Sequence, residues 1–401
     1  MSGRISLIFI ALLILFFVVP NIFNNREKAA FSNEERLEKA KQKYTISQLG
    51  DSVTVSISDY YDRGSLATYF LGEHYRDIWH TEFTLPVLDI DTLKGGLQFE
   101  KIGGGQQTIS ADVMSKSGRA YTLRSVDKDQ SKALPPILQY SLARPLFRDQ
   151  TAALNPFGAI ITASLEKTAD ILHTTPIMYF VPYDSSWNEE FQLNMSGRVV
   201  IMEEEPGREW VNLKNFNNAI RIIDSDELIP EWQSSKIEID TRNYLKCRLF
   251  DMLINDWDRH EGQWDWAVYN RDNKIIAKPI ATDRDMAFYN FNDGLLNKVA
   301  LQINNKFQSF TPEYEDISGL IRNSKELDLK LLAQMSKADF IETAEKLQST
   351  FTDESIDAAF SKYPHSIYTT YGKLHKKTFK QRLAKLDEAA GEFYDLLNAH
   401  D

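Results

Sequence analysis

The spacing of apolar residues changes part-way along this chain, and that change limits the folds it can adopt. Over residues 95–127, apolar and polar residues alternate, as they do on half-buried strands. In RNYLKCRLFDMLI (242–254), apolar residues recur at the spacing of a buried helix face. The same spacing returns in residues 339–351 and 374–397. A β-rich first part and an α-rich second part, joined near residues 203–207, predict an α+β chain with two lobes.

The β-rich part contains a glycine-rich loop between two strands. LQFEKI leads into GGGQQ (103–107), and TISADVM then alternates between apolar and polar residues. SKSG (115–118) has the composition of a tight turn, and the following RAYTLRSV alternates again. The predicted order is therefore strand, glycine loop, strand, tight turn, strand. Arg124 lies on the third strand and Lys128 just beyond its end.

Two acidic loops flank a predicted hairpin in the α-rich part. The amphipathic helix stops at Ile254, and NDWDRHEGQ (255–263) follows as a polar loop. WDWAVY (264–269) and KIIAKPI (274–280) alternate on either side of a turn, and we expect the Trp face to pack on the helical core. ATDRDMAF (281–288) comes next. Because a short hairpin brings its two ends together, the acids of both loops should lie close in space.

This order of features suits phosphoryl transfer. One carboxylate must accept or orient a hydroxyl proton, and a second must hold the divalent ion that bridges the nucleotide phosphates. Glycines elsewhere let backbone N–H groups approach those phosphates, and a cation is needed on a strand that follows them. The chain contains all four elements in the right order, with the glycine loop and the cation ahead of the two acids.

DWDRHEGQ, a hairpin and TDRDMAF resemble the catalytic segment of atypical kinases. These include the secretory-pathway Golgi casein kinases, the bacterial spore-coat kinases and, more distantly, the phosphoinositide lipid kinases. GGLQFEKIGGGQQT and YTLRSVDKD are similar to uncharacterised bacterial envelope proteins of the same superfamily, so the motifs span about residues 95–290. The resemblance implies a bilobal protein-kinase-like fold, with a β-rich N-lobe over residues 86–206 and a helical C-lobe over residues 207–401.

The resemblance also implies roles for individual residues. By matching position, Asp258 is the catalytic base, Asp283 binds the metal ion, and Gln263 stands where the family usually has Asn or Glu as a second metal ligand. Arg124, with Lys128 as a nearby substitute, stands at the phosphate-binding lysine position. The other implied nucleotide-binding residues lie on the glycine loop, an N-lobe helix and the hinge: Gly103, Gly104, Gly105, Gln106, Asp149 or Gln150, Glu203 and Glu204. We expect Gly103–Gly105 to face the two catalytic acids across a cleft.

The activity implied by the resemblance is transfer of phosphate from ATP, with Mg²⁺ or Mn²⁺, to a hydroxyl group. The acceptor stays open between an envelope protein, a glycan and a small molecule. A pseudokinase scaffold that binds nucleotide without turnover is one alternative, because Gln263 and Arg124 depart from the family pattern. A metal-dependent glycosyltransferase is another, since DWD and DRD are both D-x-D motifs. Such enzymes, however, would have alternating βα units ahead of the motif.

The N-terminus predicts a membrane anchor. Ile5–Phe23 is an uncharged stretch close to the ~20 residues that cross a bilayer as a helix. No small-residue cleavage pattern follows it, so we expect a single uncleaved anchor within residues 1–24. The resemblance places the catalytic domain in the periplasm, whereas basic residues lean weakly towards the cytoplasm. One precedes the stretch and four follow it: Arg4, then Arg26, Lys28, Arg36 and Lys39.

Residues 25–85 predict a charged stalk and an N-terminal extension. Asn33 and the following EERLEKAKQK have the pattern of a capped helix in solvent. LATYFLGEHYRDIWHTEF (66–83) is rich in aromatic residues and is expected to be buried by packing.

Composition excludes several other classes of protein. The formal net charge is -11, so a nucleic-acid partner is not expected. Cys247 is the only cysteine, which rules out an internal disulfide and a cysteine-based zinc site. The seven histidines never have the i, i+4 spacing of an HExxH metal helix.

Overall fold

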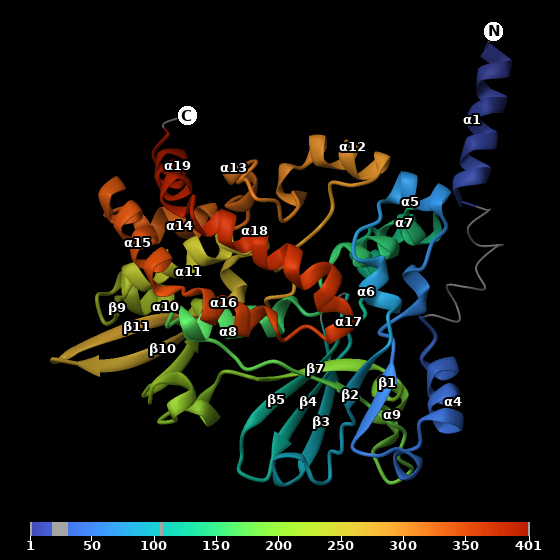
Figure 1. Cartoon of the computed structure of the whole chain (residues 1–401), viewed down its shortest axis with the longest axis horizontal. Helices are drawn as coiled ribbons and strands as arrows, with labels where there is room; N and C mark the ends of the chain where they lie inside the picture. Colours follow the sequence, from blue (N-terminus) through green and yellow to red (C-terminus); the bar gives the residue numbers. More distant parts are fainter. Residues whose placement is uncertain (1, 18–30, 105–106, 400–401) are drawn as a thin grey trace. The chain divides into compact units, whose positions relative to one another are not determined.

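The computed structural model describes residues 2–17, 31–104 and 107–399 (Figure 1). The chain divides into two compact units, and each is built from both strands and helices, which confirms the mixed α+β class. The first unit comprises residues 1–71, 76–153 and 177–203, and the second comprises residues 72–75, 154–176 and 204–401. The lobe boundaries expected from the sequence stay predictions.

A five-stranded sheet forms the centre of the first unit. Its strands run in the order β3 (Leu97–Gly103), β4 (Ser110–Ser115), β5 (Ala120–Ser125), β7 (Val199–Glu204) and β6 (Ile177–Phe180). The predicted sequence of strand, glycine loop, strand, turn and strand is therefore confirmed. The alternation also holds on β4, because Ala111 and Val113 are buried while Asp112 and Met114 are only partly covered. A second, two-stranded sheet pairs β1 (Ser52–Val55) with β2 (Phe83–Pro86).

Helix α4 (Asn33–Lys43) is mostly exposed to solvent, as predicted, but it packs against α9 (Glu189–Met195) and is not a free-standing stalk. Ala40 is fully buried at the contact. The N-cap is Ser32, whose side chain accepts the backbone N–H of Glu35, rather than Asn33. The Asn33 amide oxygen instead accepts hydrogen bonds from Arg36 (3.1 Å) and Arg198 (2.7 Å).

The aromatic segment 66–83 is buried only in its second half. Helix α6 (Arg76–His80) buries Ile78 and Trp79, as expected. Helix α5 (Ser65–Leu71) leaves Leu66, Tyr69 and Phe70 exposed, so the predicted burial was wrong there. Gly72, with φ +91°, ends α5 and separates the two halves. Further along the first unit come the 3-10 turns η5 (Pro136–Tyr140) and η6 (Gln150–Ala153) and helix α7 (Ala143–Asp149).

The second unit contains a four-stranded sheet in the order β8 (Arg221–Asp224), β10 (Trp264–Arg271), β11 (Lys274–Ala281) and β9 (Glu238–Ile239). β10 and β11 form the predicted hairpin. Trp264 and Trp266 are buried and their rings lie against Tyr244 of helix α11 (Thr241–Leu253). This contact confirms that the Trp face packs the hairpin onto a buried helix.

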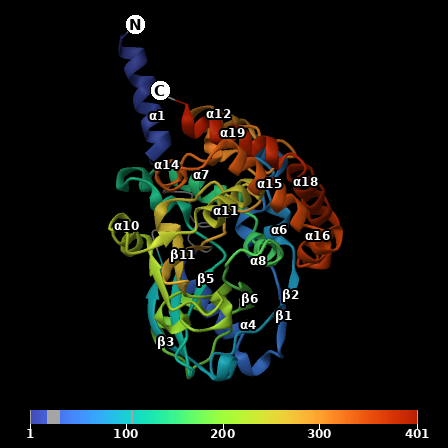
Figure 2. The same ribbon diagram turned by 90° about the vertical axis from the view of Figure 1, so that its left-hand side faces the viewer.

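Helices make up most of the rest of the second unit, and Figure 2 shows α15, α16, α18 and α19 gathered together. The predicted helix 374–397 is two helices, because the backbone leaves the helical conformation at Lys385 (φ -113°, ψ 8°). α18 then packs on α16, and α19 packs on α15. The helix bounds are α8 Gly158–Thr168, α10 Ser225–Gln233, α12 Leu295–Ile303, α13 Ile317–Leu320, α14 Lys325–Leu332, α15 Lys337–Thr350, α16 Asp353–Phe360, α17 His365–Ile367, α18 Lys373–Leu383 and α19 Leu386–Asn398.

At the N-terminus, helix α1 covers Ser2–Phe17. No helix among the described residues is both long and apolar enough to span a membrane. The predicted anchor, Ile5–Phe23, extends over residues 18–23, which lie outside the described residues.

Candidate functional site

The two acidic loops meet at the open end of the β10–β11 hairpin. The last strand pair is Trp264 with Ala281, and the backbone N–H of Thr282 donates to the carbonyl of Gln263 (3.2 Å) beyond it. Gln263 therefore lies opposite Thr282 and within one residue of Asp283. This is the closeness that the sequence predicts for the two loops.

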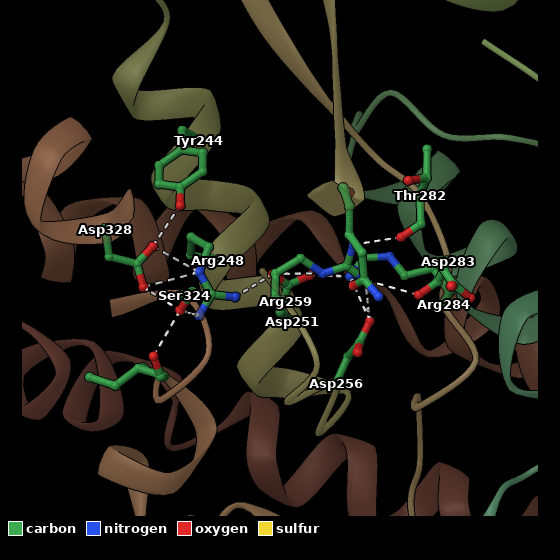
Figure 3. Close-up of polar contacts among 12 residues, drawn as sticks. Tyr244, Arg248, Asp251, Asp256, Arg259, Thr282, Asp283, Arg284, Ser324 and Asp328 are labelled. Carbon is green, nitrogen blue, oxygen red and sulfur yellow. Dashed lines mark hydrogen bonds and ion pairs between the residues drawn. The ribbon is translucent and has the colours of Figure 1, made fainter. Parts of the chain in front are cut away.

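Arg259 fastens the two loops to each other (Figure 3). Its guanidinium is fully buried and donates to three backbone carbonyls, those of Gln263 (3.1 Å), Thr282 (2.5 Å) and Asp283 (3.2 Å). Its Nη2 also donates to the Asp256 carboxylate (2.6 Å). A buried planar donor with several hydrogen bonds fixes the backbone of both loops.

Arg284 joins the same network from the second loop (Figure 3). It donates to Glu166 of α8 (2.7 Å), to Asp256 (3.1 Å) and to Asp251 of α11. Burial alone would lower the pKa of the Arg284 guanidinium, but the carboxylates, Asp251 foremost, hold that pKa well above its ordinary value. Burial would likewise raise the pKa of Asp256, but Arg259 and Arg284 outweigh it and leave that pKa below its ordinary value.

The network gives Asp256 a structural role, because Arg259 and Arg284 both donate to its Oδ2. It is 1% exposed and its charge is already matched by two arginines. A D-x-D metal motif would need both acids of DWD to be available to the ion. Only Asp258, which is half-buried, reaches the surface of the loop. The site geometry therefore argues against DWD as the metal motif of the glycosyltransferase alternative, whereas both acids of DRD, Asp283 and Asp285, are half-buried.

Asp258 is positioned by residues far away in the sequence. The Asn323 amide, between α13 and α14, donates to its Oδ1 (2.6 Å). The Lys306 ammonium lies over the Trp257 ring, 4.6 Å from the ring centroid. Burial lowers the pKa of Lys306, and the Asp258 carboxylate opposes that shift. The sequence interpretation missed both Asn323 and Lys306, because no local motif connects them to the loop.

Asp283 and Gln263 have the chemistry of a divalent-metal site. Asp283 is half-buried and its backbone is left-handed, with φ +55°. Gln263 is buried, and its side-chain oxygen has no hydrogen-bond partner among the described residues. A buried acceptor without a donor is unusual in a folded protein, and Mg²⁺ is bound through carboxylate and amide oxygens. The two residues therefore fit a divalent ion.

A metal ion held by these two residues alone would need further ligands. The described part of the chain contains no group of three or more His, Cys, Asp or Glu residues arranged to hold a metal. Mg²⁺ commonly binds through one or two carboxylates and completes its shell with water and substrate phosphates. The set of Asp283 and Gln263 therefore suits an ion that arrives with a nucleotide.

The glycine loop lies in the first unit, between β3 and β4. Gly104 has φ +108°, and a Cβ atom there would overlap the Thr108 carbonyl oxygen, so the turn requires glycine. Gly105 and Gln106 lie outside the described residues. Gly103 pairs with Ser110, and Ser110 pairs with Arg124, so Arg124 lies in the same row of the sheet as the start of the loop.

Lys128 lies beyond the end of β5, where its backbone carbonyl accepts a hydrogen bond from the Thr151 hydroxyl (3.2 Å). Both Lys128 and Arg124 are half-buried. The choice between them as the phosphate-binding cation stays a prediction.

The acid expected to bind nucleotide from the N-lobe helix pairs with two arginines instead. Asp149, at the end of α7, is 1% exposed and binds the guanidinium groups of Arg76 (2.5 Å) and Arg63 (3.0 Å). It therefore joins α7 to α6. The neighbouring Gln150 is half-buried, and its side-chain oxygen has no hydrogen-bond partner among the described residues.

Glu203 and Glu204, proposed for the hinge, are the last residues of β7, and both are half-buried. The Glu204 carboxylate accepts the backbone N–H of Thr175 (2.6 Å). Glu203 belongs to the first unit, with the glycine loop, whereas Glu204 belongs to the second, with Asp258 and Asp283. The cleft expected between the glycine loop and the acids stays a prediction.

Comparisons with known proteins found similar solved structures but no similar family model or curated protein. The fold comparison found a crystal structure described as a Helicobacter pylori proinflammatory kinase CtkA, with 10% identity and a TM-score of 0.36. The match covers 77% of this chain and 96% of that chain. A TM-score of this size does not establish a common fold, so the function has to be judged from the site's own geometry.

Proposed function

We propose that the protein is an ATP- and divalent-metal-dependent phosphotransferase acting on a hydroxyl group. The observation that carries the proposal is that the acids at the hairpin end differ in burial and in pairing with arginines. Asp256 is neutralised by Arg259 and Arg284, while Asp258 and Asp283 stay half-exposed on the two loops that Arg259 joins. Two accessible carboxylates on a rigid, charge-balanced base suit one proton acceptor and one metal ligand.

Each residue has a separate task in this proposal. Asp258, held by Asn323, accepts or orients the proton of the acceptor hydroxyl. Asp283 and the Gln263 amide oxygen hold Mg²⁺ or Mn²⁺, which supplies positive charge to the nucleotide phosphates. The glycine loop and Arg124 or Lys128 bind those phosphates. The hydroxyl belongs to an envelope protein, a glycan or a small molecule, and the chain acts at the membrane, on its periplasmic side.

Asp258→Ala and Asp283→Ala should fail in different ways. Asp283→Ala should abolish the metal-dependent stabilisation by ATP in a thermal-shift assay, because it removes a metal ligand. Asp258→Ala should keep that stabilisation and lower kcat by ~10²–10⁴, the usual worth of a positioned proton acceptor. Glu261→Ala is the matched control, since Glu261 is an acid of the same loop with neither role, and it should preserve both properties.

Other results of this comparison would contradict the proposal. Equal loss of nucleotide binding in both Asp variants, together with stabilisation by a UDP-sugar, would indicate a metal-dependent glycosyltransferase. Stabilisation of the wild type by ATP and metal, with no turnover of ATP or of any hydroxyl acceptor, would indicate a nucleotide-binding scaffold.

A further inference from the structure

Seven large apolar side chains are exposed on three short elements of the first unit. Exposed apolar groups of this size in a soluble surface usually mark a binding site. Their exposed fractions run from 37% to 76%. The residues, called the apolar patch below, are Leu66, Tyr69 and Phe70 of α5, Ile137 and Tyr140 of η5, and Leu142 and Phe147 at α7.

Contacts within the first unit hold these elements together. Arg63, just before α5, forms an ion pair with Asp149 at the end of α7 (3.0 Å). η5 leads directly into α7 and packs against it. The buried Asp149 carboxylate therefore joins the elements that carry the apolar patch, and the side chains of the patch are exposed rather than packed in the core.

The apolar patch continues into helix α1. The backbone N–H of Leu142 donates to the carbonyl of Phe16, near the end of α1 (2.7 Å). α1 carries no charged residue after Arg4, and it exposes Ile10 and Leu12–Leu15 by 42% to 59%. The apolar patch and α1 together expose many apolar side chains, whereas the apolar residues that need no explanation on a protein surface are scattered singly.

The charges around the apolar patch favour an anionic surface. None of the chain's 57 acidic residues lies within residues 64–72 or 130–148, which carry the patch, and the nearest exposed acids are Asp62 and Glu73, on either side of the first stretch. Lys132 is exposed beside it, and Arg144 lies within α7. Tyr69 and Tyr140 add amphipathic rings of the kind enriched where membrane meets water. Basic and aromatic residues around an apolar surface match an anionic lipid bilayer better than an acidic protein surface.

We propose that the apolar patch rests on the surface of a lipid bilayer. Leu66 and Ile137, the two most exposed residues of the patch on α5 and η5, enter the boundary between head groups and acyl chains. This contact lies in the plane of the membrane and is separate from any crossing of it. It does not depend on phosphotransfer.

Single cysteines report this contact directly. Cys247 is the only native cysteine and is buried, so an introduced surface thiol can be labelled alone. Leu66→Cys, Ile137→Cys and the control Ser117→Cys are labelled with a polarity-sensitive nitrobenzoxadiazole in the full chain. Ser117 is exposed in the β4–β5 turn, which lies at the other end of the first unit from α5 and α7 (Figure 1). The chain is reconstituted into phosphatidylcholine–phosphatidylglycerol vesicles, with and without lipids carrying a nitroxide on the acyl chain.

The labels at positions 66 and 137 should shift their emission to the blue and be quenched several-fold more by the nitroxide lipids than the label at position 117. Equal quenching at all three positions would overturn the proposal. Shielding from aqueous iodide that grows with the protein-to-lipid ratio, without nitroxide quenching, would assign the patch to a second copy of the chain. The same shielding in the absence of vesicles would assign it to another segment of the chain. Either result would also overturn the proposal.

Discussion

Among single residues, Arg284 pairs with three carboxylates at the candidate site. Replacing it by Met keeps much of its length but leaves Glu166, Asp251 and Asp256 without one of their cations. Removing one partner of a buried ion pair leaves an uncompensated buried charge. We expect Arg284→Met to lower the free energy of unfolding by about 3–5 kcal/mol, measured by urea denaturation.

Arg221→Met is the matched control for this change. Arg221 pairs with Glu231 at 2.8 Å, but it is 43% exposed, so its loss should cost less than about 1 kcal/mol. If Arg284→Met were as mild as Arg221→Met, the charge network would not be what holds the two loops.

His375 should make the stability of the second unit depend on pH in the acidic range. Burial lowers its pKa to about 3, and its ring nitrogens lie within hydrogen-bond distance of Tyr363 (2.8 Å) and Tyr75 (3.1 Å). The unfolded chain takes up a proton near the ordinary pKa of about 6.5, while the folded chain stays neutral down to about 3. The contribution of neutral His375 to the free energy of unfolding is therefore complete above pH 6.5 and is lost as the pH falls towards 3.

The variant His375→Gln isolates this effect, because Gln cannot take up a proton. Between pH 7 and pH 5, the free energy of unfolding of the wild type should fall by about 2 kcal/mol more than that of the variant. Equal falls in urea denaturation at the two pH values would show that His375 is not kept neutral by the fold.

Residue-level prediction from sequence succeeded where a local motif existed. DWDRHEGQ and TDRDMAF identified two loops that the structure places at one hairpin end. Sequence alone did not separate Asp256, whose charge is buried against arginines, from Asp258, which is two residues away and half-exposed. Asn323 is 65 residues from Asp258, and only the folded chain brings the two together.

At the scale of elements, β5 decides which cation lies near the glycine loop. Arg124 is in the strand and shares a row with Gly103 through Ser110, whereas Lys128 follows the strand end. We expect Arg124→Ala to weaken ATP binding more than Lys128→Ala does, in parallel titrations with Mg²⁺ present. The reverse order would place the phosphate-binding cation at the end of β5.

Element prediction was accurate where one hydrophobic period persisted. The β3–β4–β5 run and the β10–β11 hairpin formed as their periods indicated, and α11 formed where a helix was expected, although it is buried on nearly all sides rather than on one face. It was inaccurate where a local conformation interrupts the pattern, as at Lys385, since that break does not change the hydrophobic spacing. The exposure of α5 was also missed, because spacing does not reveal whether another element covers an apolar face.

For the whole molecule, the order of segments along the chain matters as much as their contacts. The second unit combines residues 72–75 and 154–176 with the C-terminal part. A fragment of residues 204–401 would lose the ion pair of Arg284 with Glu166 and the hydrogen bond of Tyr363 with Asn155. We expect this fragment to lack a cooperative thermal transition by circular dichroism. A transition with a midpoint near that of the full chain would show that the earlier segments are dispensable.

The ion pair between Glu166 and Arg284 spans 118 residues, and this spacing has a consequence for protein synthesis. A ribosome adds ~5–20 residues per second, so Glu166 leaves the exit tunnel roughly 6–24 s before its partner. Throughout that time the carboxylate has to stay hydrated, because burying it alone is costly. Helix α8 therefore cannot complete its packing on the nascent chain until Arg284 has been synthesised. Its apolar face is then a natural target for chaperones until Arg284 arrives.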